Sequence, residues 1–76
     1  MTNSLVLKAE ILKNGFTFNK LAKAIGISYV SLSYKVNNKR EFNQSEIASI
    51  CSLLNLDDTS RNAIFFANPV DEMATN

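Results

Sequence analysis

The segment Thr17–Ser33 constrains the fold of this chain most strongly, because its spacing is that of two short helices joined by a tight turn. The helices are predicted over Phe18–Ile25 and Tyr29–Val36. Gly26 can take the left-handed backbone conformation that ends a helix without steric cost. Ala22, four residues before Gly26, allows close contact between the helices. These features predict a helix-turn-helix, a unit that projects its second helix outward from the fold.

Caps and apolar spacing support the same two helices. The hydroxyl groups of Thr17 and Ser28 can accept hydrogen bonds from the free backbone N–H groups at a helix start. Leu32 and Val36 are four residues apart and therefore share one face of the second helix. The apolar residues predicted to pack where the helices cross are Leu21, Ile25, Ile27 and Leu32.

One more helix is predicted before this unit and two after it. The first runs from Ser4 to Asn14 and ends at Gly15. Residues 37–42, after the helix-turn-helix, are predicted to form a polar loop. The apolar stripe of the first helix is predicted to consist of Leu5, Leu7, Ile11 and Leu12.

The fourth predicted helix begins at Asn43, which has the layout of a capping box with Glu46. Asn55 is expected to end this helix in a left-handed conformation. Its apolar residues recur at positions i, i+3, i+4 and i+7, a strongly amphipathic pattern. They are Ile47, Ile50, Cys51 and Leu54.

The last helix is predicted over Thr59–Ala67, with Asp57 or Asp58 as its cap. It ends with three consecutive large apolar residues, which a single helix face cannot cover. At least one of the three is therefore expected to be exposed or to contact another chain. They are the predicted interface of a homodimer or partner complex: Ile64, Phe65 and Phe66.

Length and composition bound the fold class. A chain of 76 residues with 46% apolar content is expected to form one globular domain with a small core. We expect an all-α, compact bundle of about five short helices over residues 1–68, followed by a short polar tail at residues 69–76. No apolar run reaches the roughly 18 residues that span a bilayer, and no secretory signal is recognisable. The single Cys51 fits a reduced thiol and an intracellular location.

The net charge of +1 conceals a segregation of charge along the chain. Residues 16–40 carry a net charge of +5 and no acidic residue, whereas residues 41–76 carry −5. The positive segment coincides with the predicted helix-turn-helix, where contacts to phosphates would be made. We therefore expect this surface to bind duplex DNA or an acidic protein surface.

Residues 26–28 (Gly-Ile-Ser) and residues 32–42 (Leu-Ser-Tyr-Lys-Val-Asn-Asn-Lys-Arg-Glu-Phe) resemble short Cro-like phage regulators of the lambda-repressor-like helix-turn-helix family. The resemblance covers about residues 5–67. It implies duplex DNA as the partner, a two-fold dimer on a palindromic operator, and a place in the cytoplasm of a bacterial host cell. Two positions depart from the family's pattern: Lys35, where an apolar residue is common, and Asn38, where a glycine often follows the recognition helix.

Two sets of side chains are candidates for DNA contact. Hydroxyl and apolar groups on the second helix of the motif can contact base edges, and these candidates are Tyr29, Val30, Ser31, Ser33 and Tyr34. Cations and a helix N-terminus can hold phosphates, and these candidates are Thr17, Asn19, Lys20, Lys35, Lys39 and Arg40. Arg, Asn and Gln are missing from the helix face, so we expect a modest sequence preference or a contribution from DNA shape.

The predicted function is a Cro-like repressor, a homodimer that places the helix Tyr29–Val36 in the major groove of operator DNA. The alternative is an antirepressor or modulator of repression, which would bind a phage repressor protein through the same surface. Tyr29, Tyr34 and Lys35 would then be anchors, since Tyr is enriched at interface hot spots. The chain has no His and no recognisable catalytic, metal-ligand or phosphate-loop pattern. We therefore expect no catalysis, no cofactor, no small-molecule substrate and no membrane partner.

Overall fold

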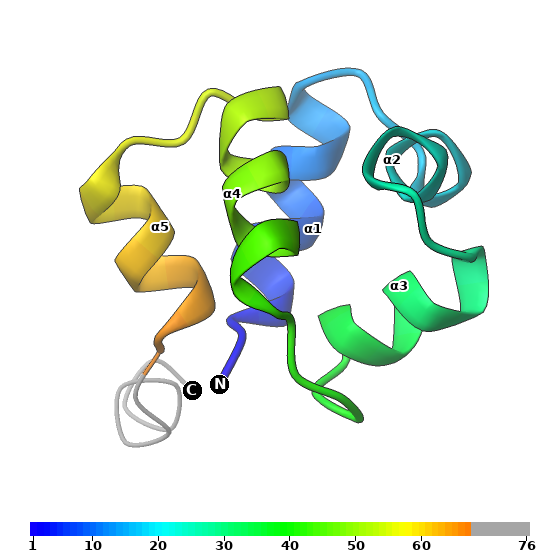
Figure 1. The fold of residues 1–76 in the computed structure, drawn as a ribbon. Coiled ribbons are helices and arrows are strands. Elements are labelled where there is room, and N and C mark those ends of the chain that lie inside the picture. Colours follow the sequence, from blue (N-terminus) through cyan, green and yellow to red (C-terminus); the bar gives the residue numbers. More distant parts are fainter. Residues whose placement is uncertain (68–76) are drawn as a thin grey trace.

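The computed structural model describes residues 1–67 of the chain. These residues form α1 (Ser4–Lys13), α2 (Phe18–Ile25), α3 (Tyr29–Val36), α4 (Gln44–Leu53) and α5 (Asp58–Phe65). In Figure 1, α1 and α4 lie in the middle of the bundle, with α5 on one side and α2 and α3 on the other. The predicted all-α bundle of five short helices is confirmed. The predicted polar tail at residues 69–76 lies outside the described residues.

Capping side chains begin each helix of the motif where the sequence predicts. The hydroxyl oxygen of Thr17 accepts a hydrogen bond from the backbone N–H of Lys20, at 3.1 Å. Ser28 accepts one from the backbone N–H of Ser31, at 3.0 Å. Gly26 has a φ of 80°, in the left-handed region, which lets the chain leave α2 and start α3 within a tight turn. The predicted bounds of α2 and α3 are confirmed.

The last two helices are also capped by predicted residues. Asn43 and Glu46 form the complete capping box at the start of α4. Of the two candidate caps of α5, Asp57 fills the role, and its carboxylate accepts a hydrogen bond from the backbone N–H of Ser60 at 2.8 Å. Asn55 has a φ of 54°, so the predicted left-handed turn after α4 is confirmed.

All five helices contribute to one core. Phe42, in the loop before α4, packs edge-to-face against Phe65 of α5, with ring centroids 5.3 Å apart. This contact holds the loop after α3 against the centre of the bundle. The core side chains are Leu7, Ile11, Leu21, Ala22, Leu32, Val36, Phe42, Ile47, Ile50, Leu54, Ile64 and Phe65.

The predicted apolar stripe of α1 is half wrong. Leu7 and Ile11 are buried, but the side chains of Leu5 and Leu12 are 77% and 73% exposed. Leu5 and Leu12 are seven residues apart and share one face, which lies about 130° around the helix from the buried pair because each residue advances the helix by about 100°. The bundle covers only the face of α1 that carries Leu7 and Ile11.

The N-terminal segment ties α3 to α5. The side-chain amide of Asn38 donates to the carbonyl of Thr2 and its oxygen accepts from the N–H of Thr2, both at 2.8 Å. On the other side, the N–H of Asn3 donates to the carbonyl of Ile64 at 2.6 Å. Asn38 has a φ of 64°, so it keeps the left-handed turn after α3 in the absence of a glycine. Its side chain adds a contact that glycine could not make.

None of the helices within residues 1–67 is long and apolar enough to cross a membrane.

Candidate nucleic-acid interface

The outer face of α3 combines aromatic, apolar and hydroxyl groups. Of the predicted base-edge candidates, Tyr29, Val30 and Tyr34 are exposed, whereas Ser31 and Ser33 are half-buried. The opposite face of α3 is held in the core by Leu32 and Val36, which are fully buried. The helix is therefore anchored along one side, and its other side faces solvent.

Tyr29 rests against the start of α2. Its ring lies 6.1 Å, centroid to centroid, from the ring of Phe18, at an angle of 51°. Such a tilted aromatic contact limits the positions that an exposed tyrosine can take. Tyr29 therefore presents its ring and hydroxyl from the junction of the two helices of the motif.

Two cations lie over the ring of Tyr34, near the C-terminal end of α3. The ammonium group of Lys39 lies 5.6 Å from the centre of that ring, and the guanidinium carbon of Arg40 lies 5.4 Å from it. Both distances allow a cation–π interaction. The chain reaches this position because the backbone N–H of Lys39 donates to the carbonyl of Tyr34 at 2.8 Å. The loop after α3 thus returns toward the helix and places two predicted phosphate contacts beside it.

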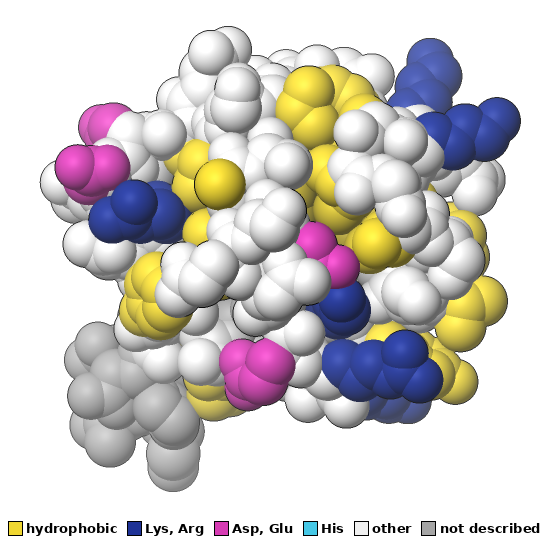
Figure 2. Space-filling model, in the orientation of Figure 1, with side chains coloured by type: hydrophobic (Ala, Val, Ile, Leu, Met, Phe, Trp, Pro, Cys, Tyr) yellow, Lys and Arg dark blue, Asp and Glu magenta, His cyan; other side chains and the backbone are white. Residues whose placement is uncertain are grey.

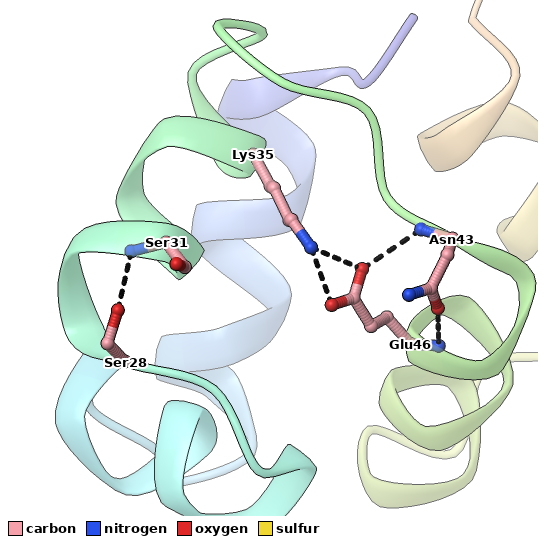
Figure 3. A network of polar contacts seen from close by, with 5 residues as sticks. All are labelled: Ser28, Ser31, Lys35, Asn43 and Glu46. Atoms are coloured by element: carbon pink, nitrogen blue, oxygen red, sulfur yellow. Dashed lines mark hydrogen bonds and ion pairs between the residues drawn. The ribbon is translucent and has the colours of Figure 1, made fainter.

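Lys35 is not part of this exposed surface. Its side chain is 15% exposed, and its ammonium group donates to both carboxylate oxygens of Glu46, at 2.7 and 2.6 Å. Figure 3 shows Lys35 pointing from α3 toward Glu46 and the capping box at the start of α4. The prediction that Lys35 holds a phosphate is therefore wrong, because its ammonium group forms a largely buried ion pair with Glu46.

The same contact gives a structural reason for a charged residue at position 35 of α3. Glu46 receives the ammonium group of Lys35 and the backbone N–H of Asn43, the latter at 2.9 Å. Burial raises the pKa of Glu46, but the hydrogen bond and charge of Lys35 and the N–H of Asn43 outweigh it. The net pKa lies below its usual value, so this carboxylate stays ionised at neutral pH.

The remaining cations of the motif are exposed. Lys20 and Lys23 lie on α2, and Lys39 and Arg40 follow α3; within residues 1–67 none of them forms an ion pair. Lys23 was not among the predicted site residues, although its place in the charged segment 16–40 was a usable signal. In Figure 2, basic side chains gather at the edge formed by α2 and α3, while the opposite edge, over α5, shows acidic side chains next to a basic one.

The start of α2 contributes predicted phosphate candidates as well. Thr17, Asn19 and Lys20 are all exposed. No acidic residue lies in the first turn of α2, so the positive end of its dipole is not neutralised there. This end of α2 and the cations after α3 are separate basic features of one motif.

The expectation that at least one of the three apolar residues at the end of α5 is exposed is confirmed, but the assignment of all three to an interface is wrong. Ile64 and Phe65 are 1% and 4% exposed, because α5 packs against both α1 and α4 and uses these two side chains to do so. Only Phe66, at 54% exposure, is available to another molecule. Two of the three residues therefore hold the monomer together.

Among residues 1–67, no group of three or more His, Cys, Asp or Glu side chains could hold a metal ion. Burial raises the pKa of the Cys51 thiol, which lowers the share of reactive thiolate at neutral pH. The exposed aromatic rings and cations around α3 are suited to binding a polyanion or a protein surface.

No curated protein matches this chain. A family described as a protein of unknown function, DUF739, matches residues 4–68, which takes in all five helices. The chain therefore belongs to the DUF739 family.

Proposed function

We propose that this protein is a phage or prophage-type transcription regulator that binds operator DNA through α3, in the manner of a Cro-like repressor. Two copies would each place α3 in the major groove of a palindromic site. The cations on either side of α3 would hold the phosphates, and Tyr29, Val30 and Ser33 would contact base edges.

One observation carries this proposal. The exposed side of α3 adjoins Lys39 and Arg40, which lie within 5.6 Å of the ring of Tyr34 and have no acidic partner within the described residues. Unpaired cations beside an outward-facing helix are the arrangement that phosphate binding needs, since contacts to phosphates supply most of the affinity of such proteins for DNA. In this view Tyr34 supports phosphate contacts more than it reads bases.

The proposal is tested by titrating the protein into labelled duplex DNA from its own promoter region at several salt concentrations. We expect the logarithm of the association constant to fall linearly with the logarithm of salt concentration. Three phosphate contacts per protomer, from Lys20, Lys39 and Arg40, would give a slope of about −3 per protomer. Binding that is absent at low salt, or insensitive to salt, would contradict direct DNA binding.

A second candidate function is modulation of repression, in which the same surface binds a phage repressor protein. The observation that favours it is the composition of the exposed face of α3. Tyr29, Val30 and Tyr34 are exposed there, while Arg, Asn and Gln are missing from that face. Tyr is a frequent hot-spot residue at protein interfaces, whereas Arg, Asn and Gln discriminate best between bases.

The two functions separate when the repressor encoded next to this protein is added to the promoter titration. A DNA-binding regulator forms its own footprint without the repressor. A modulator forms no footprint alone, but changes or removes the footprint of the repressor and co-elutes with it in gel filtration.

A further inference from the structure

The two cations after α3 share one aromatic ring instead of an acidic partner. Lys39 and Arg40 are adjacent in sequence, carry the same charge and are exposed. Glu41 follows them, but no carboxylate within residues 1–67 forms an ion pair with either side chain. Lys and Arg side chains have many rotamers, and two like charges repel each other. Without a further contact, the two charged groups would therefore tend to move apart in solvent.

The ring of Tyr34 supplies that contact. The ammonium nitrogen of Lys39 lies 5.6 Å from the ring centre, and the guanidinium carbon of Arg40 lies 5.4 Å from it. The face of an aromatic ring attracts a cation within about 6 Å, and at an exposed site this attraction enriches the contacting rotamers several-fold. The ring therefore gathers both positive charges at one place, beside the exposed face of α3.

The backbone of the loop is fixed by contacts that do not use this ring. The N–H of Lys39 donates to the backbone carbonyl of Tyr34 at 2.8 Å, and the side-chain amide of Asn37 donates to the carbonyl of Ser33 at 2.9 Å. Asn38 is held by its paired hydrogen bonds to the N-terminal segment. Replacement of the Tyr34 side chain leaves all these bonds in place. The ring thus orients the two cations without shaping the loop that carries them.

We propose that Tyr34 is a positioning residue that holds Lys39 and Arg40 as a preformed clamp for the phosphate groups of duplex DNA. Fixing the two long side chains before the DNA arrives reduces the entropy lost on binding. The ring carries no charge, so it raises the affinity without adding to the counterions released from DNA. The proposal rests on the proposed DNA-binding function and gives Tyr34 a part in it that is distinct from base reading.

The experiment measures the affinity of the full chain for labelled promoter duplex at several salt concentrations, with two variants of Tyr34. Tyr34→Leu suits a helix but has no face that attracts cations, whereas Tyr34→Phe keeps the ring and loses only the hydroxyl. We expect Tyr34→Leu to bind about 5- to 30-fold more weakly per protomer, with an unchanged salt slope. Tyr34→Phe should match the wild type.

Two results would overturn the clamp. Wild-type affinity in Tyr34→Leu would show that the ring positions nothing that DNA binding needs. A Tyr34→Phe variant as weak as Tyr34→Leu would assign the effect to a hydroxyl contact with DNA. A wild-type chain that binds no promoter DNA would instead overturn the proposed function, and the clamp with it.

The same substitution in the Lys39→Ala/Arg40→Ala background separates positioning from direct contact. Once both cations are removed, the ring has nothing to position, so adding Tyr34→Leu should change the remaining low-salt affinity no further. An equal loss from Tyr34→Leu in both backgrounds would overturn the proposal, because the ring would then act on DNA or on the fold itself.

NMR spectroscopy of the free protein gives a readout that needs no DNA. The side-chain methylene protons of Lys39 and Arg40 should be shifted upfield by the ring current in the wild type and in Tyr34→Phe. In Tyr34→Leu they should return to the values of an unstructured chain, while the backbone shifts of α1, α4 and α5 stay unchanged and confirm the fold. Wild-type protons without the upfield shift would overturn the proposal, whatever the DNA measurements show.

Discussion

The ammonium group of Lys35 in α3 lies 2.6 and 2.7 Å from the two carboxylate oxygens of Glu46 in α4. This pair joins the proposed recognition helix to the capping box of the next helix, as Figure 3 shows. It also removes one cation from the surface that is proposed to bind DNA. The setting of α3 against the bundle therefore depends on an electrostatic contact as well as on Leu32 and Val36, which are fully buried.

The first prediction concerns the loss of this pair. Lys35→Met leaves the ionised Glu46 buried with only the N–H of Asn43, so we expect the free energy of unfolding to fall by about 3 kcal/mol. Glu46→Gln keeps the capping box, since Gln can fill the same position, and should cost less because the Lys35 ammonium can shift toward solvent. The double variant Lys35→Met/Glu46→Gln should recover part of the stability that Lys35→Met loses. Urea denaturation measures the free energy of unfolding of all three variants. An unchanged free energy of unfolding in Lys35→Met would contradict a stabilising buried pair.

The second prediction concerns the dependence of stability on pH. The pKa of Glu46 in the folded protein lies below its usual 4.5, so the folded state releases this proton more readily than the unfolded state. The resulting stability is fully present above about pH 4.5 and is lost as the pH falls through the lowered pKa. Urea denaturation between pH 7 and pH 3 should show this loss.

The matched comparison for the pH experiment is Glu46→Gln. Hydrogen bonds from the backbone N–H and the hydroxyl of Ser60 also lower the pKa of Asp57, so the wild-type profile contains both carboxylates. Only the difference between the wild-type and Glu46→Gln profiles reports on Glu46. Parallel profiles would show that the Lys35 pair contributes nothing in this pH range.

The third prediction compares two neighbouring residues of α1. Ile11 is fully buried, so Ile11→Ala should lower the free energy of unfolding by about 3 kcal/mol through lost contacts and a cavity. Leu12 is exposed, so Leu12→Ala should change it by no more than about 0.5 kcal/mol. Thermal denaturation of the two variants checks the face of α1 that the bundle covers, and similar losses would place both residues in the core.

The fourth prediction concerns Asn38. Asn38→Gly keeps the left-handed turn but removes the paired hydrogen bonds to Thr2, so a loss of about 1–2 kcal/mol is expected. Asn38→Ala removes the same hydrogen bonds and also strains the backbone at a φ of 64°, which should make it the less stable variant. If alanine were tolerated better than glycine, the left-handed turn would not be required.

Local signals in the sequence were sufficient to predict most of the fold. Thr17, Ser28 and Asn43 bond backbone groups within their own helix starts, so their roles depend on a few neighbouring residues. Gly26 likewise ends α2 through its own backbone conformation. These contacts do not depend on how the helices pack, and the helix bounds that they set are confirmed.

The wrong predictions share a dependence on packing between distant segments. The burial of Ile64 and Phe65 depends on α5 lying against both α1 and α4, and helical spacing alone does not contain this information. Lys35 was assigned to the surface because local sequence does not reveal its partner. That partner, Glu46, is eleven residues away on another helix. A usable signal was its position between Leu32 and Val36, where the side chain cannot point fully away from the bundle.

The α3 surface is tested most directly by measuring the affinity for labelled promoter duplex of three proteins: wild type, the double variant Lys39→Ala/Arg40→Ala, and Lys13→Ala. Lys13 is an exposed lysine on α1, outside the proposed surface, and controls for the loss of positive charge. We predict that the double variant binds more weakly and that its salt slope is smaller by about 2 per protomer, while Lys13→Ala matches the wild type. Equal losses in the two variants, or no wild-type binding at low salt, would contradict α3 and its adjoining cations as the DNA-binding surface.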